Sequence, residues 1–516
     1  MLSALPRVAV LIHVFLIAAY LAWARGGTRA DLYGPLPWLA LGLLELVILF
    51  PPVRREETDG MARRRVVRAI LRDPVFYLGL ALMVFLGIQW MNGPRALTYD
   101  AESGSWSYSL PPLPSWPFSV APAESCQPLY WFGMAYAAVL AVRHGLSRRA
   151  KTNLLRLMAA NGALLALFGA VQMASGTQSV YWYTPLDVFF FASFGYPNHG
   201  GAFFVLMFCV SGGLLLQAMS DPDHRAYVGW MAAALILNLT GVVLTLSRGA
   251  ILLSAALLVA GMIYAFTFLW PVISGATKLR TLVVALLVAG VAAFLFFAAY
   301  PQNAVRRELA TLSTLPKLRE AFVGDRVPLF DAAWRIWKDH PWAGVGGWGF
   351  RRFAGLYLKP DEWDLLRKHG KANVHNDPLQ FLCEHGVVGM GLILATAVIL
   401  IVPIFMRLKA AIRPPGGEEF AEKPFIIRVS PLVWALMGGT FCVFLYSLVD
   451  LPFRSPAVLY PWAVCLATAS GMIPRLKWRA AGADASRRAR HVERGASGAG
   501  DEGDGEESRR SRADEA

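Results

Sequence analysis

Charged residues are scarce in this sequence. Asp, Glu, Lys and Arg together make up only 16% of its 516 residues, whereas soluble domains carry roughly a quarter. Hydrophobic residues make up 56%, and the mean hydropathy is +0.45. This composition argues against a soluble enzyme and predicts a membrane protein.

Cysteine is also rare, and its spacing excludes the common metal and redox sites. Three of the five cysteines lie inside apolar stretches, so we interpret the set as apolar packing residues. The sequence leaves open whether Cys126 and Cys383, which could both face the outer side, form a disulfide. The five are Cys126, Cys209, Cys383, Cys442 and Cys465.

Several ligand-binding motifs are missing as well. The glycine-rich turn at 344–349 lacks the strand, helix and Lys-Ser/Thr of a P-loop, and we interpret it as a structural bend after His340-Pro341. Glu384-His385 does not complete a His-Glu-x-x-His zinc motif. We therefore predict no metal and no cofactor. No basic tract is interleaved with aromatic residues, so the net charge of +14 predicts no nucleic-acid partner.

What the sequence does contain is long apolar stretches. A membrane span needs about 20 apolar residues, and about twelve stretches meet that need. The first is followed by Arg25-Gly26-Gly27 rather than a small-residue cleavage site, so we expect it to be retained as a span. The expected spans are 8–24, 35–52, 75–91, 128–144, 154–174, 199–219, 227–246, 250–270, 281–299, 386–406, 431–449 and 456–474.

The basic residues predict an orientation. They gather in the loops after the second, fourth, eighth, tenth and last stretches, which all fall on one side, and basic short loops mark the cytoplasmic side. Both termini are then cytoplasmic. The residues are Arg54, Arg55, Arg63, Arg64, Arg65, Arg68, Arg72, Arg143, Arg148, Arg149, Lys151, Lys278, Arg280, Arg407, Lys409, Arg413, Arg475, Lys477 and Arg479.

The fold class that follows is an all-α polytopic membrane protein with a large helical loop on the outer side, between the ninth and tenth spans. The tail after Arg479 is nearly free of large apolar residues, so we expect it to be disordered. The expected parts are helices in 1–190, helices in 191–299, the loop at 300–385, helices in 386–478 and the tail at 479–516.

Arg248 is the first candidate for function. It lies in Leu246-Ser247-Arg248-Gly249, between two apolar stretches with almost no loop between them. A guanidinium at the edge of the membrane is costly and usually functional. The alternative is an arginine that reaches the headgroups from a tight hairpin.

Arg326 is the second candidate. It precedes Pro328 and a segment with apolar residues at helical spacing, which predicts a helix that begins beside Arg326. A helix N-terminus favours an anion, and the planar guanidinium suits bidentate binding of phosphate. The alternative is a salt bridge to Asp325 or Asp331.

His375 is the third and sharpest candidate. Asn376-Asp377-Pro378 predicts the cap and first turn of a helix that runs into the tenth span. The positive end of that helix disfavours imidazolium, and a neutral imidazole is what a general base needs. The alternative is a capping or packing histidine.

These phrases together resemble the O-antigen ligase/polymerase superfamily, membrane glycosyltransferases of the GT-C type. The resemblance covers roughly residues 190–390. The segments that carry it are Gly195-Tyr196-Pro197-Asn198, Ser247-Arg248-Gly249, the region from Arg326 to Trp334, His340-Pro341-Trp342-Ala343-Gly344-Val345-Gly346, and His375-Asn376 with Leu379-Gln380 and Glu384-x-Gly386.

The resemblance implies a donor and a mechanism. The donor would be an undecaprenyl-pyrophosphate-linked glycan, gripped by Arg248 and Arg326 at the periplasmic leaflet. His375 would activate the acceptor hydroxyl, with inversion at the anomeric carbon and without metal. The residues expected to contact the substrates are Asn198, His199, Trp334, Asn376 and Gln380.

The acceptor is left open. A ligase passes the glycan to lipid A–core, a polymerase extends a growing polysaccharide such as an exopolysaccharide, and a protein O-oligosaccharyltransferase uses Ser or Thr. A polysaccharide or lipid transporter, or flippase, is the alternative from another class, and it would show polar groups near the membrane midplane.

Overall fold

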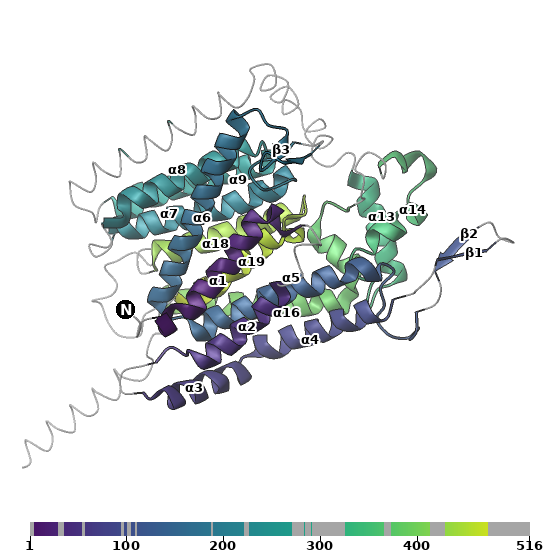
Figure 1. The fold of residues 1–516 in the computed structure, drawn as a ribbon, viewed down its shortest axis with the longest axis horizontal. Coiled ribbons are helices and arrows are strands. Elements are labelled where there is room, and N and C mark those ends of the chain that lie inside the picture. The colour runs from purple at the N-terminus through teal and green to yellow at the C-terminus, as the bar shows by residue number, and fades with distance from the viewer. Residues whose placement is uncertain are drawn as a thin grey trace, which may run out of the picture.

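The computed structural model describes most of the chain as a bundle of helices (Figure 1). The described ranges are 5–28, 36–53, 57–93, 97–100, 105–108, 111–186, 189–220, 226–270, 326–365, 373–412 and 429–472, with the single positions 283 and 290.

A helix occupies every predicted span except 281–299, which lies outside the described ranges. The tail from 479 and the start of the long loop, up to Asp325, lie outside them too. The helices at the predicted spans are α1 (Leu5–Trp23), α2 (Leu36–Leu49), α4 (Pro74–Met91), α5 (Pro122–Leu140), α6 (Arg148–Ala174), α7 (Pro197–Ser220), α8 (Val228–Leu244), α9 (Arg248–Tyr264), α16 (Asp377–Ile412), α18 (Pro431–Ser447) and α19 (Pro456–Met472).

Length and apolar composition mark five described helical segments as able to cross a membrane. Several further helices are apolar but shorter, among them α8 and α18. The chain is therefore a multi-pass membrane protein, while the count of about twelve spans stays a prediction. The five segments are Pro74–Met91, Arg148–Ala174, Pro197–Ser220, Arg248–Phe268 and Asp377–Met406.

The arginine-rich segment after α2 forms a helix that the sequence analysis did not predict. This helix, α3 (Asp59–Leu71), begins at Thr58, whose side chain accepts a hydrogen bond from the Met61 N–H. Its inner face buries Ala62, Val66 and Ile70. The segment was interpreted only as a topology signal, because its apolar residues are too few and too small to suggest a span.

Four short strands also depart from the all-α expectation. β1 (Leu97–Asp100) pairs with β2 (Ser105–Tyr108), and β3 (Ser179–Val180) pairs with β4 (Thr184–Pro185), both antiparallel. Both hairpins lie in loops between spans, where local turn chemistry decides the structure, and neither alters the helical architecture (Figure 1).

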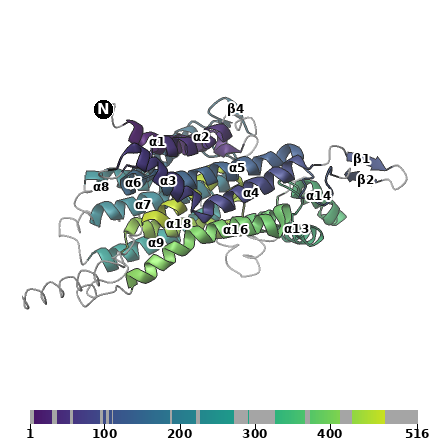
Figure 2. The same ribbon diagram turned by 90° about the horizontal axis from the view of Figure 1, so that it is seen from below.

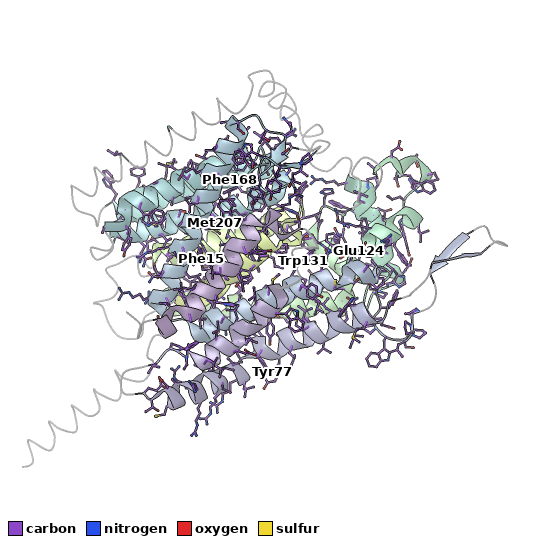
Figure 3. All side chains as sticks on the ribbon, in the orientation of Figure 1. Phe15, Tyr77, Glu124, Trp131, Phe168 and Met207 are labelled. Carbon is purple, nitrogen blue, oxygen red and sulfur yellow. The ribbon has the colours of Figure 1, made fainter. Side chains whose placement is uncertain are left out.

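The main core fills the space between the helices, and side chains occupy the gaps that the ribbon leaves (Figure 3). Trp131 of α5 and Met207 of α7 are each at most 2% exposed. A second, smaller core lies under the described part of the long loop, where α13 (Val327–Asp339) and α14 (Phe350–Tyr357) pack together at one end of the bundle (Figures 1 and 2).

The glycine-rich turn holds this loop against the start of α16. The N–H of Val345 donates to the Cys383 carbonyl at 3.1 Å, and that of Gly346 donates to the Glu384 carbonyl at 2.8 Å. Inside α16, Gly386 adopts a φ of 62°, and a Cβ there would lie 2.3 Å from the Trp342 carbonyl carbon. Glycine is therefore required at this contact, and the turn is the structural bend that we predicted.

Candidate functional site

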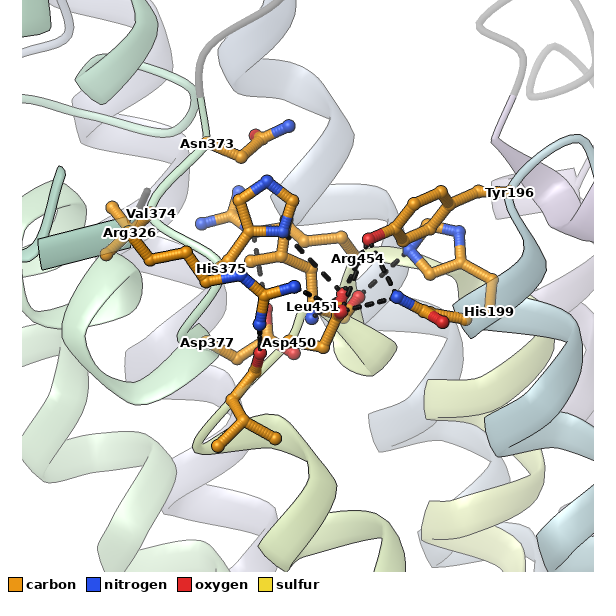
Figure 4. A network of polar contacts seen from close by, with 12 residues as sticks. Tyr196, His199, Arg326, Asn373, Val374, His375, Asp377, Asp450, Leu451 and Arg454 are labelled. Carbon is orange, nitrogen blue, oxygen red and sulfur yellow. Dashed lines mark hydrogen bonds and ion pairs between the residues drawn. The ribbon is translucent and has the colours of Figure 1, made fainter. Parts of the chain in front are cut away.

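A buried carboxylate, Asp450, organises the polar contacts at the end of the bundle near α13 (Figure 4). It lies in the short connection between α18 and α19. Its Oδ2 accepts a hydrogen bond from Asn198 Nδ2 at 2.6 Å, and its Oδ1 accepts one from the Tyr196 hydroxyl at 3.0 Å. Two residues just before or within the first turn of α7 thus bind a residue near the C-terminal end of the chain.

His375 and Arg326 approach the same carboxylate from the long loop. His375 Nδ1 lies 3.9 Å from Asp450 Oδ1, and Arg326 Nη2 lies 3.6 Å from Asp450 Oδ2. Arg326 Nη1 also donates to the Val449 carbonyl. The side chains of His375 and Arg326 remain 16% and 28% exposed, so both can reach a ligand while Asp450 stays beneath them.

The surroundings keep Asp450 negatively charged. Burial alone would raise the pKa of this carboxyl group, but the His375 imidazole, the Arg326 guanidinium and the Leu451 N–H together lower the pKa below its ordinary value. A carboxylate that stays ionised can hold the imidazole of His375 in one orientation and tautomer, with Nδ1 toward Asp450 and Nε2 away from it.

The backbone of His375 is strained. Its φ is 56°, in the left-handed region that non-glycine residues adopt at a cost of about 1–3 kcal/mol. Adjacent contacts maintain this conformation, because Gln380 Oε1 accepts from the Val374 N–H at 3.1 Å and Asn376 Nδ2 donates to the Leu448 carbonyl at 2.9 Å. Such strain occurs often where a side chain must be held in place for function.

The helix starts around the site agree with the sequence analysis. Asn376 Oδ1 accepts from the Leu379 N–H at 2.9 Å, which caps α16 as predicted. Arg326 immediately precedes α13, which begins with Val327 and Pro328, also as predicted. The alternative for Arg326 was a salt bridge to Asp325 or Asp331. Asp331 pairs instead with Arg335 at 2.9 Å, and Asp325 lies outside the described residues.

Arg248 is the first residue of α9 and is exposed. The turn before it contains Leu246 with a φ of 54°. Ser247 Oγ lies 2.6 Å from the Tyr446 hydroxyl, and the carbonyl of Tyr446 accepts from the Asp450 N–H at 3.0 Å. Tyr446 thus connects the start of α9 with the Asp450 turn.

The other predicted contact residues occupy different environments. His199 is 9% exposed, and its Nε2 lies 3.0 Å from the Leu451 carbonyl oxygen. Gln380 is fully buried and donates to Glu384 Oε1 at 2.9 Å, so in this structure it supports the site from below. Trp334 is 43% exposed on α13, beside Trp337.

A buried ion pair lies beneath the site. Arg454 Nη2 donates to Glu384 Oε2 at 2.6 Å, and its Nε lies 3.7 Å from Asp377 Oδ1. The arginine is 2% exposed and its guanidinium carbon lies 4.7 Å from the ring centroids of Trp348 and Phe381. This pair ties the start of α16 to the α18–α19 connection and so fixes His375 relative to Asp450.

Three residues of the site were not predicted from the sequence: Asp450, Tyr196 and Arg454. A signal for two of them was present, because Asp450 and Arg454 are the charged residues between the last two apolar stretches, and charge at a span boundary is usually functional. Tyr196 lies in a segment that was noted only for its resemblance.

The described residues contain neither a cluster of metal ligands nor a disulfide. Across the residues that the structure describes, no group of three or more His, Cys, Asp or Glu side chains could hold a metal ion. All five cysteines lie in the described ranges and are free thiols, so Cys126 and Cys383 do not pair, as their interpretation as packing residues requires.

Residues 233–394 match the family model Wzy_C, described as O-antigen ligase. The matched segment runs from within α8 to within α16 and contains Arg248, Arg326 and His375. Tyr196 and Asn198 precede it, and Asp450 follows it. No curated protein matches the chain significantly.

Proposed function

We propose that the chain is a member of the O-antigen ligase/polymerase superfamily, whose family model residues 233–394 match, and that it transfers a glycan from undecaprenyl pyrophosphate to an acceptor hydroxyl. The observation that carries this proposal is the meeting of Arg326 and His375, from different parts of the long loop, at the carboxylate of Asp450. This meeting supports the roles proposed below, in which Arg326 binds phosphate and His375 is the base.

In this proposal His375 is the general base. With Nδ1 directed toward Asp450, Nε2 carries the lone pair that accepts the proton of the acceptor hydroxyl. The separation of 3.9 Å between Nδ1 and Oδ1 exceeds a hydrogen bond, and contacts of this kind often shorten when substrate binds. Asp450 stabilises the imidazolium that forms.

Arg326 and Arg248 act on the leaving group. The acceptor oxygen forms a bond to the anomeric carbon, while the bond from that carbon to the pyrophosphate oxygen breaks and its electrons leave with undecaprenyl pyrophosphate. Negative charge on the pyrophosphate rises as the bond breaks, so fixed guanidinium groups stabilise the transition state more than the ground state. Attack from the face opposite the leaving group inverts the anomeric carbon, and no metal takes part in these steps.

The residues that were expected to contact the substrates have two different roles in this proposal. Asn376, His199 and Asn198 position the histidine and the carboxylate, and Gln380 supports the loop that carries them. Trp334, exposed on α13, offers a ring on which a sugar can stack. The predicted orientation places the site at the periplasmic leaflet of the inner membrane, with both termini in the cytoplasm and membrane lipids around the bundle.

The decisive experiment is transfer by the purified full chain. The protein in lipid nanodiscs receives an undecaprenyl-pyrophosphate-linked glycan and, separately, lipid A–core, a second lipid-linked repeat or a Ser/Thr peptide. We expect release of undecaprenyl pyrophosphate together with glycan on one of the first two acceptors, and neither product with His375→Ala. Transfer only to the peptide would identify a protein O-oligosaccharyltransferase instead.

Reconstituted liposomes separate the enzyme from a transporter. Movement of the lipid-linked glycan across the bilayer with no new glycosidic bond would contradict the proposal.

A further inference from the structure

An arginine of α14 contacts the segment that carries the proposed base. Arg351, in the first turn of α14, donates from Nε and Nη2 to Asn373 Oδ1 at 3.3 and 3.2 Å. Asn373 lies two residues before His375, on the segment drawn in Figure 4. A guanidinium from one helix of the long loop is thereby joined to the short stretch that ends at His375.

Arg351 differs from the arginine next to it. Arg352 is exposed, and its Nη2 lies 3.0 Å from Glu124 Oε1, which is an ordinary surface ion pair. Arg351 is half-buried, and among the residues that the structure describes no carboxylate forms an ion pair with it. Its hydrogen bonds to the neutral Asn373 amide are therefore not one side of a surface salt bridge.

The charge of Arg351 is supported by an aromatic ring instead. Its guanidinium carbon lies 3.6 Å from the centroid of Trp348, a contact that stabilises a partly desolvated cation. Burial, together with repulsion from Arg454, lowers the pKa of Arg351 to about 10. The side chain consequently remains protonated at neutral pH and keeps all of its donors.

The ring under Arg351 is itself held firmly. Trp348 is 7% exposed, and its Nε1 donates to Gln127 Oε1 of α5 at 2.9 Å. The guanidinium carbon of Arg454 lies 4.7 Å from the same ring centroid, and Arg454 pairs with Glu384 of α16. Trp348 thus connects Arg351 to α5 and to the buried ion pair beneath the site.

The segment that Arg351 contacts needs support from both sides. His375 has a φ of 56°, and such a conformation persists only where the surrounding structure holds it. Asn376 caps α16 on the C-terminal side. On the N-terminal side, the Val374 N–H donates to Gln380 Oε1 at 3.1 Å and Arg351 binds Asn373. Loss of the Arg351 contact would let the segment relax and the His375 ring move from Asp450.

We propose that Arg351 is a positioning residue for His375. It holds Asn373 against α14, and the segment from Asn373 to His375 in turn keeps the imidazole facing Asp450. The inference rests on the proposed role of His375 as the base. Because the hydrogen bonds of Arg351 go to the protein, it acts on the rate of the chemical step and not on the binding of donor or acceptor.

The first test measures the segment itself and needs no glycan transfer. Hydrogen exchange of the purified full chain in detergent is followed by mass spectrometry in peptides that contain Val374, whose N–H is bound by Gln380. Arg351→Met keeps an apolar stem over Trp348 but cannot donate to Asn373. We expect this variant to exchange several-fold faster than the wild type in those peptides.

The second test measures the kinetics of transfer in nanodiscs. Arg351→Met should lower kcat by about 10-fold or more with little change in KM, since a small displacement of a catalytic group can cost that much. Arg351→Lys keeps a donor for Asn373 Oδ1 and should restore part of kcat. Asn373→Leu should reproduce the loss, and the double variant should be no slower than the slower single variant.

Arg352→Met is the matched control, one residue along α14, because it removes the ion pair with Glu124 and leaves the Asn373 contact in place. It should change neither hydrogen exchange nor kcat. Equal effects in Arg352→Met and Arg351→Met would show a general weakening of α14 and would overturn the proposal. A raised KM with unchanged kcat in Arg351→Met would overturn it too, because Arg351 would then bind substrate directly.

Failure of this inference and failure of the proposed function give different results. If the wild type transfers no glycan, or if His375→Ala retains transfer, the proposed function is wrong, while hydrogen exchange still tests the Arg351 contact. If His375→Ala abolishes transfer but Arg351→Met keeps the exchange and the kcat of the wild type, only the positioning role of Arg351 is wrong.

Discussion

The Nδ1 atom of His375 faces the Oδ1 atom of Asp450 at 3.9 Å, although α16 and α18 lie between these residues in the chain. Arg326 binds the other oxygen of the same carboxylate. The proposed base and the proposed phosphate-binding group are therefore organised by one residue outside the segment that matches the family.

His375→Ala should abolish glycan transfer while the protein remains in the membrane. A positioned base contributes about 10²–10⁴-fold to rate, so we expect a loss of that size in the nanodisc assay. The control is His340→Phe, because His340 packs between the rings of Phe118 and Phe353 on the same loop. Normal transfer by His375→Ala would rule out the base.

Asp450→Asn should lower transfer through its effect on His375. The amide keeps the volume of the carboxylate but cannot stabilise an imidazolium, so we expect a loss of about 10²-fold or more. A double-mutant cycle provides the specific readout. In the His375→Ala background the added Asp450→Asn change should have almost no further effect on rate.

An additive effect of the two changes would instead make Asp450 an independent structural residue. Asp331→Asn serves as the control for removing a carboxylate at this end of the protein, because Asp331 is exposed and pairs only locally with Arg335 in α13. We expect it to leave the transfer rate unchanged.

Arg326→Lys should be nearly as damaging as Arg326→Ala. Lysine keeps the charge but cannot bind the Val449 carbonyl and Asp450 while also presenting a planar edge to pyrophosphate. We expect both variants to lose roughly 10²-fold in the rate of transfer. Arg335→Lys, on the same helix, should retain activity. Full activity in Arg326→Lys would mean that only the charge of Arg326 matters.

Glu384→Gln should destabilise the protein, because it removes the carboxylate that lies 2.6 Å from Nη2 of the buried Arg454 and leaves the Asp377 carboxyl group at 3.7 Å from Nε. Breaking a buried ion pair typically costs about 3–5 kcal/mol. We expect a clearly lower midpoint of thermal unfolding in detergent. The comparison is Glu124→Gln, which removes the exposed pair with Arg352 at 3.0 Å, worth about 0–1 kcal/mol. Similar midpoints in both variants would contradict the structural role of Arg454.

Local patterns predicted much of the fold. The apolar stretches marked α1, α2, α4 to α9, α16, α18 and α19. The Asn376-Asp377-Pro378 cap and the start of α13 after Arg326 were also correct. These features depend on residues within one or two turns of each other, so a single sequence displays them. The β-hairpins and α3 were missed because loop segments carry weaker local patterns.

The sequence by itself determined that this chain spans a membrane many times and which of its residues carry charge at the span ends. Only the tertiary structure decided which of these charges meet: Asp450 with His375 and Arg326, Arg454 with Glu384, and Asp73 with Arg143. The reason is physical. Hydropathy and helix caps act between neighbours along the chain, whereas a buried charge is satisfied by whatever partner helix packing brings near, and that partner is distant in sequence.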